Sequence, residues 1–335
     1  MSAREPFRIG AIETAAGARK DLRIKVSEQT HAGPLHIPVT VVHGARRGPT
    51  LFVTSTIHGD ELNGIEVIRQ LRHAIDPGRL RGTLLLVAIA NPVSFVLQQR
   101  GLPDGRDLNR CFPGRRRGTI GSEIAHDLFQ KIILRCDAGV DLHTAGRGRS
   151  NLPHVRADMK SPRVRRLAKA FGAAIVIDMP GEKGSLRREG ARARIPVITV
   201  EAGEALRFEP AAIDMALNGL LNLLSAWKMI PDRRRGARRT LVFHRHVWLR
   251  ARRGGILVMT ISPGDVVRKG QPLGFSSRPL GTRQIDIAAP FDSLVVSAAT
   301  IPTVLPGSAI CHLLPLNGEK PSIVRKYLKG YRGRG

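Results

Sequence analysis

Two histidines and a glutamate occupy positions at which a metal site could form. The stretch TSTIHGDELNGIE (residues 54–66) follows an apolar run and places His58 and Glu61 within four positions. The segment DAGVDLHT (residues 137–144) places His143 at the end of another apolar run. A catalytic zinc ion takes histidine nitrogens and carboxylate oxygens as three protein ligands and keeps one position for water. We therefore expect one zinc ion per chain at His58, Glu61 and His143, although a single histidine so placed is more often a hydrogen-bonded core residue.

Hydrolysis at such a site also needs a base near the water and a cation near the developing oxyanion. Glu201 in PVITVEAG follows β-branched residues and is poorly explained by packing. Arg110 lies beside Asn109 in the irregular segment DGRDLNRCFPG (residues 104–114), where ordinary surface charge is the alternative interpretation. Asp60 is expected to cap the helix that starts after it.

The elements that would position these residues alternate between strands and helices. Expected strands cover residues 51–57, 83–90, 138–144, 173–179 and 195–203. Expected helices cover residues 61–75, 122–134, 164–172 and 210–230. This alternation predicts a largely parallel or mixed sheet with helices on both faces. Ligands of such sheets bind beyond the carboxyl ends of the strands, which is where the candidate residues lie.

The pattern changes after residue 230. The polar, basic segment PDRRRGARRT (residues 231–240) is typical of a linker, and short apolar pieces separated by Gly and Pro follow it. Two of these pieces align with a shift of 37 positions, which pairs Leu257 with Leu294 and Gly270 with Gly307. They predict a small β-domain of two similar halves. GDVVRKGQPL resembles the biotinyl/lipoyl-like barrel-sandwich fold, but residues 274–290 hold no lysine that could carry a cofactor, so packing or shaping an active-site rim is the expected role.

The chain is strongly basic, with a net charge of +27 over 335 residues. Residues 231–335 alone hold 19 Lys and Arg against 5 Asp and Glu. Such charge attracts nucleic acids and other anions. Because no aromatic residues are interleaved with the basic ones and no zinc-finger or RNA-recognition signature is present, we expect no specific nucleic-acid partner.

Cysteine usage and hydropathy indicate the cellular compartment of the protein. The three cysteines are odd in number and form no CxxC pair, which fits a reducing compartment. The amino-terminal residues have no apolar core of signal-peptide length, and no apolar run approaches 18 residues. We therefore expect a cytoplasmic protein without a membrane partner.

The motifs HGDE, DLNRCFPG, DLHT and VEAG, in this order, resemble the succinylglutamate desuccinylase/aspartoacylase family of zinc-dependent amidohydrolases, which is related to the zinc carboxypeptidases. The resemblance covers roughly residues 20–230 and implies an α/β fold with a carboxypeptidase-like mixed sheet flanked by helices, plus a small carboxyl-terminal all-β, barrel-sandwich-like domain. The expected division is a catalytic domain at 1–230, a basic linker at 231–240, a β-domain at 241–320 and a basic tail at 321–335. The implied activity is hydrolysis of the amide bond of a small N-acylated amino acid or amine.

The resemblance also implies roles for single residues. His58, Glu61 and His143 would be zinc ligands and Glu201 the general base. Asn109 and Arg110 would contact the substrate, with Arg110 polarising the scissile carbonyl or binding a carboxylate.

Two departures leave the substrate open. The aspartoacylase branch places a late tyrosine on the substrate, whereas the only tyrosines here are Tyr327 and Tyr331 near the end of the chain. An arginine ahead of DLNR binds the substrate carboxylate in that branch, and both Arg100 and Arg106 are candidates here. The segments DGRDLNRCFPG and GRGRSNLPHVR are more similar to the bacterial deacylase-like branch, which includes enzymes that deacetylate N-acetyl-diaminobutyrate.

Two other functions compete with a deacylase. A zinc carboxypeptidase would act on peptides, but its late catalytic tyrosine is missing and an added β-domain would narrow the cleft. A non-catalytic basic binding protein on a hydrolase fold is the other alternative, and the full set of candidate ligands and base argues against it. Whether the chain forms a homo-oligomer stays open.

Overall fold

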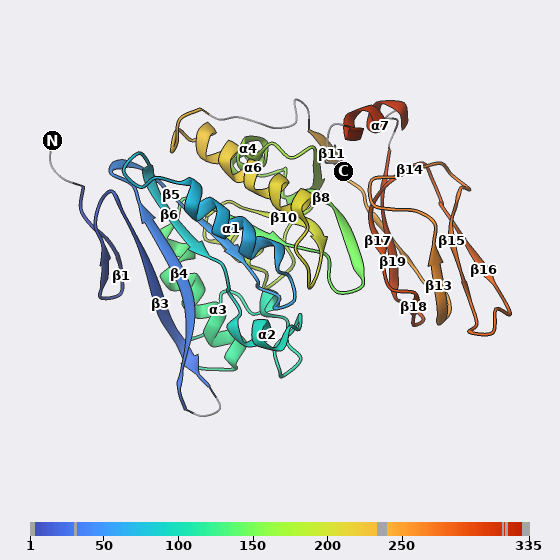
Figure 1. The fold of residues 1–335 in the computed structure, drawn as a ribbon, viewed down its shortest axis with the longest axis horizontal. Helices are drawn as coiled ribbons and strands as arrows, with labels where there is room; N and C mark the ends of the chain where they lie inside the picture. Colours follow the sequence, from blue (N-terminus) through green and yellow to red (C-terminus); the bar gives the residue numbers. More distant parts are fainter. Residues whose placement is uncertain (1–3, 30–31, 233–239, 317, 319–320, 330–335) are drawn as a thin grey trace.

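The computed structural model describes residues 4–29, 32–232, 240–316, 318 and 321–329, and a large mixed sheet runs through it (Figure 1). Among these residues the sheet contains β3 (Ala18–Glu28), β4 (Pro34–His43), β5 (Arg46–Ser55), β6 (Arg81–Val87), β7 (Ala138–His143), β8 (Arg149–Ala157), β9 (Ile175–Asp178), β10 (Val197–Glu204), β11 (Leu241–Phe243), β12 (Val247–Arg250), β14 (Val266–Val267), β17 (Ser293–Ala299) and β19 (Ala309–Pro315). Neighbouring strands follow the order β12-β19-β17-β8-β10-β7-β5-β6-β4-β3. Strand β14 lies beside β17, β9 beside β8, and β11 beside β9.

The centre of this sheet is parallel. Strand β5 pairs in parallel with β6 and with β7, and β7 pairs in parallel with β10. Parallel strands end at the same edge of a sheet, so the residues that follow β5 meet the ends of β7 and β10. His143 and Glu201 are register partners on β7 and β10. The predicted α/β fold with a mixed sheet is confirmed.

Helices cover both faces of the sheet. They are α1 (Asn63–Ala74), α2 (Pro92–Leu97), α3 (Ile120–Lys131), α4 (Pro162–Phe171), α5 (Leu186–Arg192) and α6 (Pro210–Ala226), with 3-10 turns η1 (Leu108–Arg110) and η2 (Ile133–Arg135). Helices α1, α4 and α6 pack on one face, where Leu71, Leu167 and Leu220 join one core cluster. Helix α3 packs on the opposite face through Ile124 and Leu128. Helices α1, α3, α4 and α6 each bury apolar residues spaced three to four positions apart, as the sequence periodicity predicts, whereas the short helices α2 and α5 do not.

One close approach inside the sheet admits only glycine. Phe52 on β5 lies opposite Gly139 on β7, and both are register partners in the central sheet. A Cβ atom on Gly139 would lie 1.9 Å from Cζ of the Phe52 ring. Because Phe52 is fully buried and every residue of β7 is buried, neither can move aside without disturbing the core.

The carboxyl-terminal strands are continuous with the large sheet. Strand β17 pairs antiparallel with β8, and β19 and β12 extend the sheet beyond it. A separate four-stranded antiparallel sheet follows the order β16-β15-β13-β18 and contains β13 (Gly255–Met259), β15 (Pro272–Ser277), β16 (Ile285–Ala288) and β18 (Thr303–Val304). Figure 1 shows these strands at the side of the molecule farthest from β1 (Phe7–Ile9), which pairs with β2 (Ile12–Thr14).

The two halves of this region exchange strands. A shift of 37 residues carries the bounds of β14 onto those of β18, as the sequence repeat predicts. Strand β14 of the first half pairs with β17 of the second, and β18 of the second half pairs with β13 of the first. Gly270 and Gly307 occupy equivalent turns with φ of 78° and 81°, a conformation that favours glycine.

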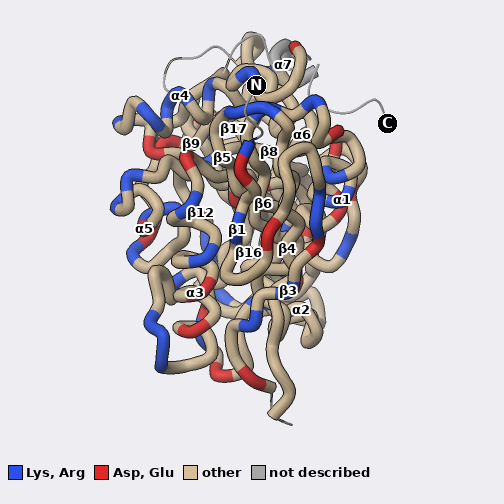
Figure 2. The backbone as a smooth tube through the Cα atoms, turned by 90° about the vertical axis from the view of Figure 1, so that its left-hand side faces the viewer, with Lys and Arg blue, Asp and Glu red and all other residues tan. Residues whose placement is uncertain are grey.

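The ends of this region fall partly outside the described residues. Positions 233–239 of the expected basic linker lie outside them. The expected basic tail contains helix α7 (Pro321–Lys329), which buries Val324 and Leu328 against a core cluster that includes Leu294 and Leu314. Among the described residues, no helix has both the length and the apolar character needed to cross a membrane. Figure 2 shows Lys and Arg interspersed with Asp and Glu along many elements on the side it presents.

Candidate metal centre and active site

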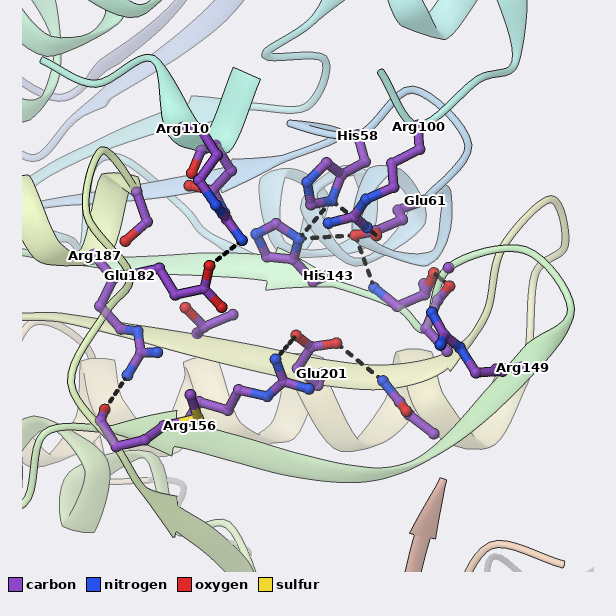
Figure 3. Close-up of a pocket in the computed structure, with 18 of the residues that line it drawn as sticks. His58, Glu61, Arg100, Arg110, His143, Arg149, Arg156, Glu182, Arg187 and Glu201 are labelled. Carbon is purple, nitrogen blue, oxygen red and sulfur yellow. Dashed lines mark hydrogen bonds and ion pairs between the residues drawn. The ribbon is translucent and has the colours of Figure 1, made fainter. Parts of the chain in front are cut away.

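Three buried side chains from different elements converge at the carboxyl edge of the sheet (Figure 3). His58 follows β5, Glu61 lies in the turn before α1, and His143 is the last residue of β7. The Glu61 carboxylate connects the two rings, because Oε1 lies 2.8 Å from Nδ1 of His58 and Oε2 lies 2.8 Å from Nδ1 of His143. The two Nδ1 atoms are 3.2 Å apart. Two nitrogens and a carboxylate therefore face one point, as the sequence predicts.

Two further carboxylates orient the histidine rings. Nε2 of His58 lies 3.1 Å from Oδ1 of Asp107, and Nε2 of His143 lies 2.7 Å from Oδ2 of Asp141. Asp141 also accepts a hydrogen bond of 2.7 Å from the hydroxyl of Thr54. Each ring thus directs Nε2 to a carboxylate and Nδ1 to the convergence point, which is the usual arrangement around a metal-binding histidine.

The electrostatics of the cluster favour a cation at its centre. Burial alone would lower the pKa of His143, but the Asp141 and Glu61 carboxylates outweigh it and raise that pKa well above its usual value. Burial would raise the pKa of Glu61, but the neighbouring His58 and His143 lower it well below its usual value. A carboxylate this deeply buried requires positive charge beside it.

The three side chains fit a zinc ion. Their ligand atoms all lie within 4.8 Å of one another, and the group could hold a metal ion. Two imidazole nitrogens and one carboxylate oxygen match the protein ligands of catalytic zinc sites, which leave one position for water. The rings also have the outer carboxylate partners that such sites require.

Asp60 does not cap helix α1 as the sequence predicts. The helix begins at Asn63 with Leu62 at the capping position, and no side chain makes a cap hydrogen bond there. Asp60 is buried, and its Oδ1 has no hydrogen-bond partner within the described part of the chain. Burial, followed by the neighbouring Glu61, raises the pKa of its carboxyl group. The turn that directs Glu61 toward the two histidines delays the helix start by two residues, from 61 to Asn63, and this moves Asp60 out of the capping position.

Glu201 on β10 lines the same pocket and is held by two donors. Its Oε2 accepts a hydrogen bond of 3.0 Å from Nδ2 of Asn151, and its Oε1 lies 3.2 Å from Nη1 of Arg156. Both donors come from β8, the antiparallel neighbour of β10. The carboxylate is therefore fixed in orientation. It lines the same pocket as His58, Glu61 and His143, which we call the donor cluster.

The two arginines ahead of the DLNR motif are placed differently. Nη1 of Arg100 lies 3.0 Å from Oε1 of Glu61, and its Nη2 lies 3.3 Å from Asp107. Arg106 instead forms an ion pair of 2.7 Å with Asp104 and is not among the residues that line the pocket. Of these two candidates, the structure brings only Arg100 into the pocket.

The DLNR motif itself forms the 3-10 turn η1. Asn109 lines the pocket, and its Oδ1 accepts a hydrogen bond of 2.9 Å from the backbone N–H of Leu186. Arg110 also lines the pocket and forms an ion pair with Glu182. Both residues thus line the same pocket as His58, Glu61 and His143, and Asn109 also ties the motif to α5. That they contact the substrate stays a prediction.

Several pocket residues have no counterpart in the sequence-based expectations. The pocket has a volume of about 280 Å³ and includes Asn151, Arg149, Arg156, Arg187 and Trp248. The first three lie on β8, within the segment GRGRSNLPHVR, whose concentration of polar residues was a usable signal. Trp248 comes from β12, far along the chain, and no local pattern marks it.

Positive charge dominates this pocket. It is lined by Arg100, Arg110, Arg149, Arg156 and Arg187 against Glu61, Glu182 and Glu201. Burial, and then the neighbouring Arg156, lowers the pKa of the Arg187 guanidinium to about 10. Even so, Arg187 keeps its charge at neutral pH, so a ligand carrying negative charge is favoured.

The chain matches a known family model. Residues 47–227, more than half of the chain, match the Succinylglutamate desuccinylase/Aspartoacylase catalytic domain. An N-alpha-acetyl-L-2,4-diaminobutyric acid deacetylase from Halomonas elongata is 29% identical over 268 residues, which cover 75% of this chain and 77% of the relative. A succinylglutamate desuccinylase from Burkholderia thailandensis is 36% identical over 118 residues, but these cover only 34% of this chain and 32% of that protein.

Solved structures show the same fold. A crystal structure of a succinylglutamate desuccinylase/aspartoacylase from Rhodobacter sphaeroides has a TM-score of 0.79 and 27% identity, with 88% of this chain and 95% of that chain covered. The product-bound ectoine utilization protein EutE (DoeB) from Ruegeria pomeroyi has a TM-score of 0.79 and 22% identity, with 89% and 94% covered.

Proposed function

The chain belongs to the succinylglutamate desuccinylase/aspartoacylase family, and from this premise we propose that it is a zinc-dependent hydrolase that cleaves the amide bond of a small N-acylated amino acid or amine. The observation that carries the proposal is the convergence of His58, Glu61 and His143 beside Glu201 in one arginine-lined pocket. In this proposal the first three residues hold one zinc ion. When bound, zinc supplies Lewis-acid polarisation and lowers the pKa of a water molecule.

Glu201 is the proposed general base. Its carboxylate would accept a proton from the attacking water and pass it to the nitrogen that leaves. The bonds from Asn151 and Arg156 hold both carboxylate oxygens in place, so the base need not be reoriented during the reaction.

Arg110, Asn109 and Arg100 are proposed to contact the substrate. Arg110 enters the pocket on a short 3-10 turn and would polarise the scissile carbonyl, because a guanidinium there stabilises a developing oxyanion. Arg100 is the proposed contact for a substrate carboxylate in preference to Arg106, which lies outside the pocket lining.

The size and charge of the pocket support a small anionic substrate. A volume of about 280 Å³ is at the lower end of ligand pockets and suits a small molecule better than an extended peptide. Five arginines favour a substrate that carries a carboxylate. The deacetylase relative adds support for an N-acetyl amino acid as the substrate class.

The alternative functions remain as competitors with less support. A peptide-directed zinc carboxypeptidase has less support because its late catalytic tyrosine is missing: the only tyrosines are Tyr327 and Tyr331. The presence of all three candidate ligands together with an anchored Glu201 argues against a non-catalytic basic protein. We also propose that residues 1–230 form the catalytic domain and residues 241–320 a β-domain that shapes its rim, because Trp248 lines the pocket.

The decisive experiment combines metal analysis with a substrate panel. The purified protein should contain about one zinc per chain and hydrolyse N-acetyl or N-succinyl amino acids faster than short peptides. Preferential release of carboxyl-terminal residues from peptides would favour the carboxypeptidase. Stoichiometric zinc with no turnover of any amide would favour a binding protein.

A further inference from the structure

Arg149 is a pocket cation that forms no ion pair with any residue in the described part of the chain. Within the described residues, no carboxylate lies at ion-pair distance from its guanidinium, whereas three of the other pocket arginines each pair with a glutamate. The remaining one, Arg187, donates a hydrogen bond of 2.6 Å to the carbonyl of Met179. Arg149 instead lies over the indole of Trp248, with Cζ 5.2 Å from the ring centroid. A half-buried guanidinium held this way keeps its N–H edge available for a ligand.

Trp248 is itself fixed by a second stacked ring. It lies parallel to the imidazole of His312, with ring centroids 4.1 Å apart and an interplanar angle of 7°. Trp248 and His312 are register partners on β12 and β19. His312 is 2% exposed, and its Nε2 lies 3.1 Å from Nδ1 of His246. Arg149, Trp248 and His312 therefore form a column, which we call the Arg149 column, with a buried base and a cationic end in the pocket.

The cationic end of the Arg149 column faces the donor cluster. A Cβ atom placed on Gly146 would lie 3.5 Å from Nη2 of Arg149 and 3.9 Å from Nη1 of Arg100, so the two guanidiniums border one small space. The same Nη1 atom of Arg100 reaches Glu61. Figure 3 shows Arg149 and Arg187 on opposite sides of Glu201. The positive charges of Arg149 and Arg100 border one space beside the proposed catalytic residues, and they favour the binding of an anion there.

We propose that Arg149 binds an anionic group of the substrate, a carboxylate by preference, and that Trp248 is the positioning residue that holds it in the pocket. The nature of the substrate rests on the proposed deacylase function, but the binding of an anion does not require turnover. A guanidinium stacked on an indole has few alternative orientations, and its planar edge can donate two parallel hydrogen bonds to a carboxylate. The β-rich region thus contributes to substrate choice without touching the metal ligands.

The chain offers a spectroscopic reporter of this binding. It contains only two tryptophans. The other, Trp227, is the C-cap residue of α6, and replacing it by Phe leaves Trp248 as the sole indole. Succinate is the anionic probe, and the uncharged succinamide is its matched control. We expect succinate to change Trp248 emission saturably and succinamide to have little effect, with calorimetry on the zinc-loaded protein giving the affinity independently.

Substitutions then separate binding from folding. Arg149→Met should weaken succinate binding by about tenfold or more, because a hydrogen-bonded charge pair is lost. Arg149→Lys, which retains the charge without the planar fork, should retain part of the affinity and serves as the second variant if Arg149→Met does not fold. Arg79→Met is the matched control, since Arg79 is exposed in the turn before β6, outside the pocket lining.

A double-mutant cycle tests the positioning role of Trp248. Trp248→Leu should weaken succinate binding in the parent and have almost no further effect in Arg149→Met, while Trp248→Phe should restore part of the loss. Equal weakening in both backgrounds would overturn the positioning role. Succinate affinity that is unchanged by Arg149→Met, or no succinate binding to the parent, would overturn the anion site. Because none of these measurements uses turnover, an inactive protein would refute the proposed function and leave this result interpretable.

Discussion

Replacing Glu201 by Gln tests the proposed base with almost no change in shape. Glutamine cannot accept the proton of the attacking water, and general-base catalysis contributes about 10²–10⁴ in rate. We therefore expect kcat to fall by that factor, which corresponds to about 2.7–5.4 kcal/mol of transition-state free energy. Zinc should stay bound, because Glu201 is not among the three clustered ligands.

The structure also defines what this substitution costs apart from chemistry. Each Glu201 oxygen faces a donor, at 3.0 Å from Asn151 and 3.2 Å from Arg156. The NH₂ group of glutamine must face one of them, so one hydrogen bond to a charged acceptor is lost, worth about 1.5–3 kcal/mol of stability. That loss should lower the melting temperature without releasing the metal.

Glu204→Gln is the matched control for this experiment. Glu204 lies on the same strand, is equally buried, and accepts a hydrogen bond of 2.6 Å from Thr300, but it does not line the pocket. The assay measures kcat on an N-acyl amino acid and zinc by elemental analysis, with both variants compared at equal folded concentration. Near-normal turnover of Glu201→Gln would show that another residue is the base. Loss of zinc together with activity would make Glu201 a ligand.

Three further predictions follow from the site and the core. His143→Ala should abolish stoichiometric zinc, because it removes one of three converging donors, and full zinc occupancy by elemental analysis would refute the assignment. Arg110→Lys should lower kcat/KM by about 10²-fold, the effect of losing an oxyanion donor; unchanged kinetics would reduce Arg110 to a surface ion pair with Glu182. Gly139→Ala should lower the free energy of unfolding by about 1–3 kcal/mol, because the added methyl overlaps Phe52; an unchanged urea midpoint would show that the ring moves aside.

The strand and helix pattern was predictable because it rests on local periodicity. Apolar runs and helical stripes located strands β5, β6, β7, β9 and β10 and helices α1, α3, α4 and α6 to within about five residues of their observed bounds, while α2, α5 and β8 were not predicted. The convergence of the proposed metal ligands was predictable for the same reason. His58 and His143 each end an apolar run, and the ends of parallel strands meet at one edge of a sheet. Their convergence now agrees with that expectation.

The start of α1 was not predictable from local rules. Asp60 has the side chain of a helix cap, but the helix begins at Asn63. The contacts of Glu61 with both histidines explain this later start. One of these contacts is with His143 on β7, a strand about eighty residues later in the chain. A tertiary contact thus overrides the capping preference.

The sequence by itself determined the types of the elements that local periodicity marks, the repeat in the carboxyl-terminal region, and the placing of His58 and His143 at strand ends, because each of these can be read along the chain. Only the tertiary structure decided which arginines share the pocket. A register shift between β10 and β8 gives β8 one extra residue, because Glu201 pairs with His154 while Gly203 pairs with Asn151. A one-residue bulge changes the face on which later side chains lie, so Asn151 and Arg156 can both hold Glu201 although strict alternation would separate them. Trp248 joins them through long-range strand pairing, which no local sequence pattern encodes.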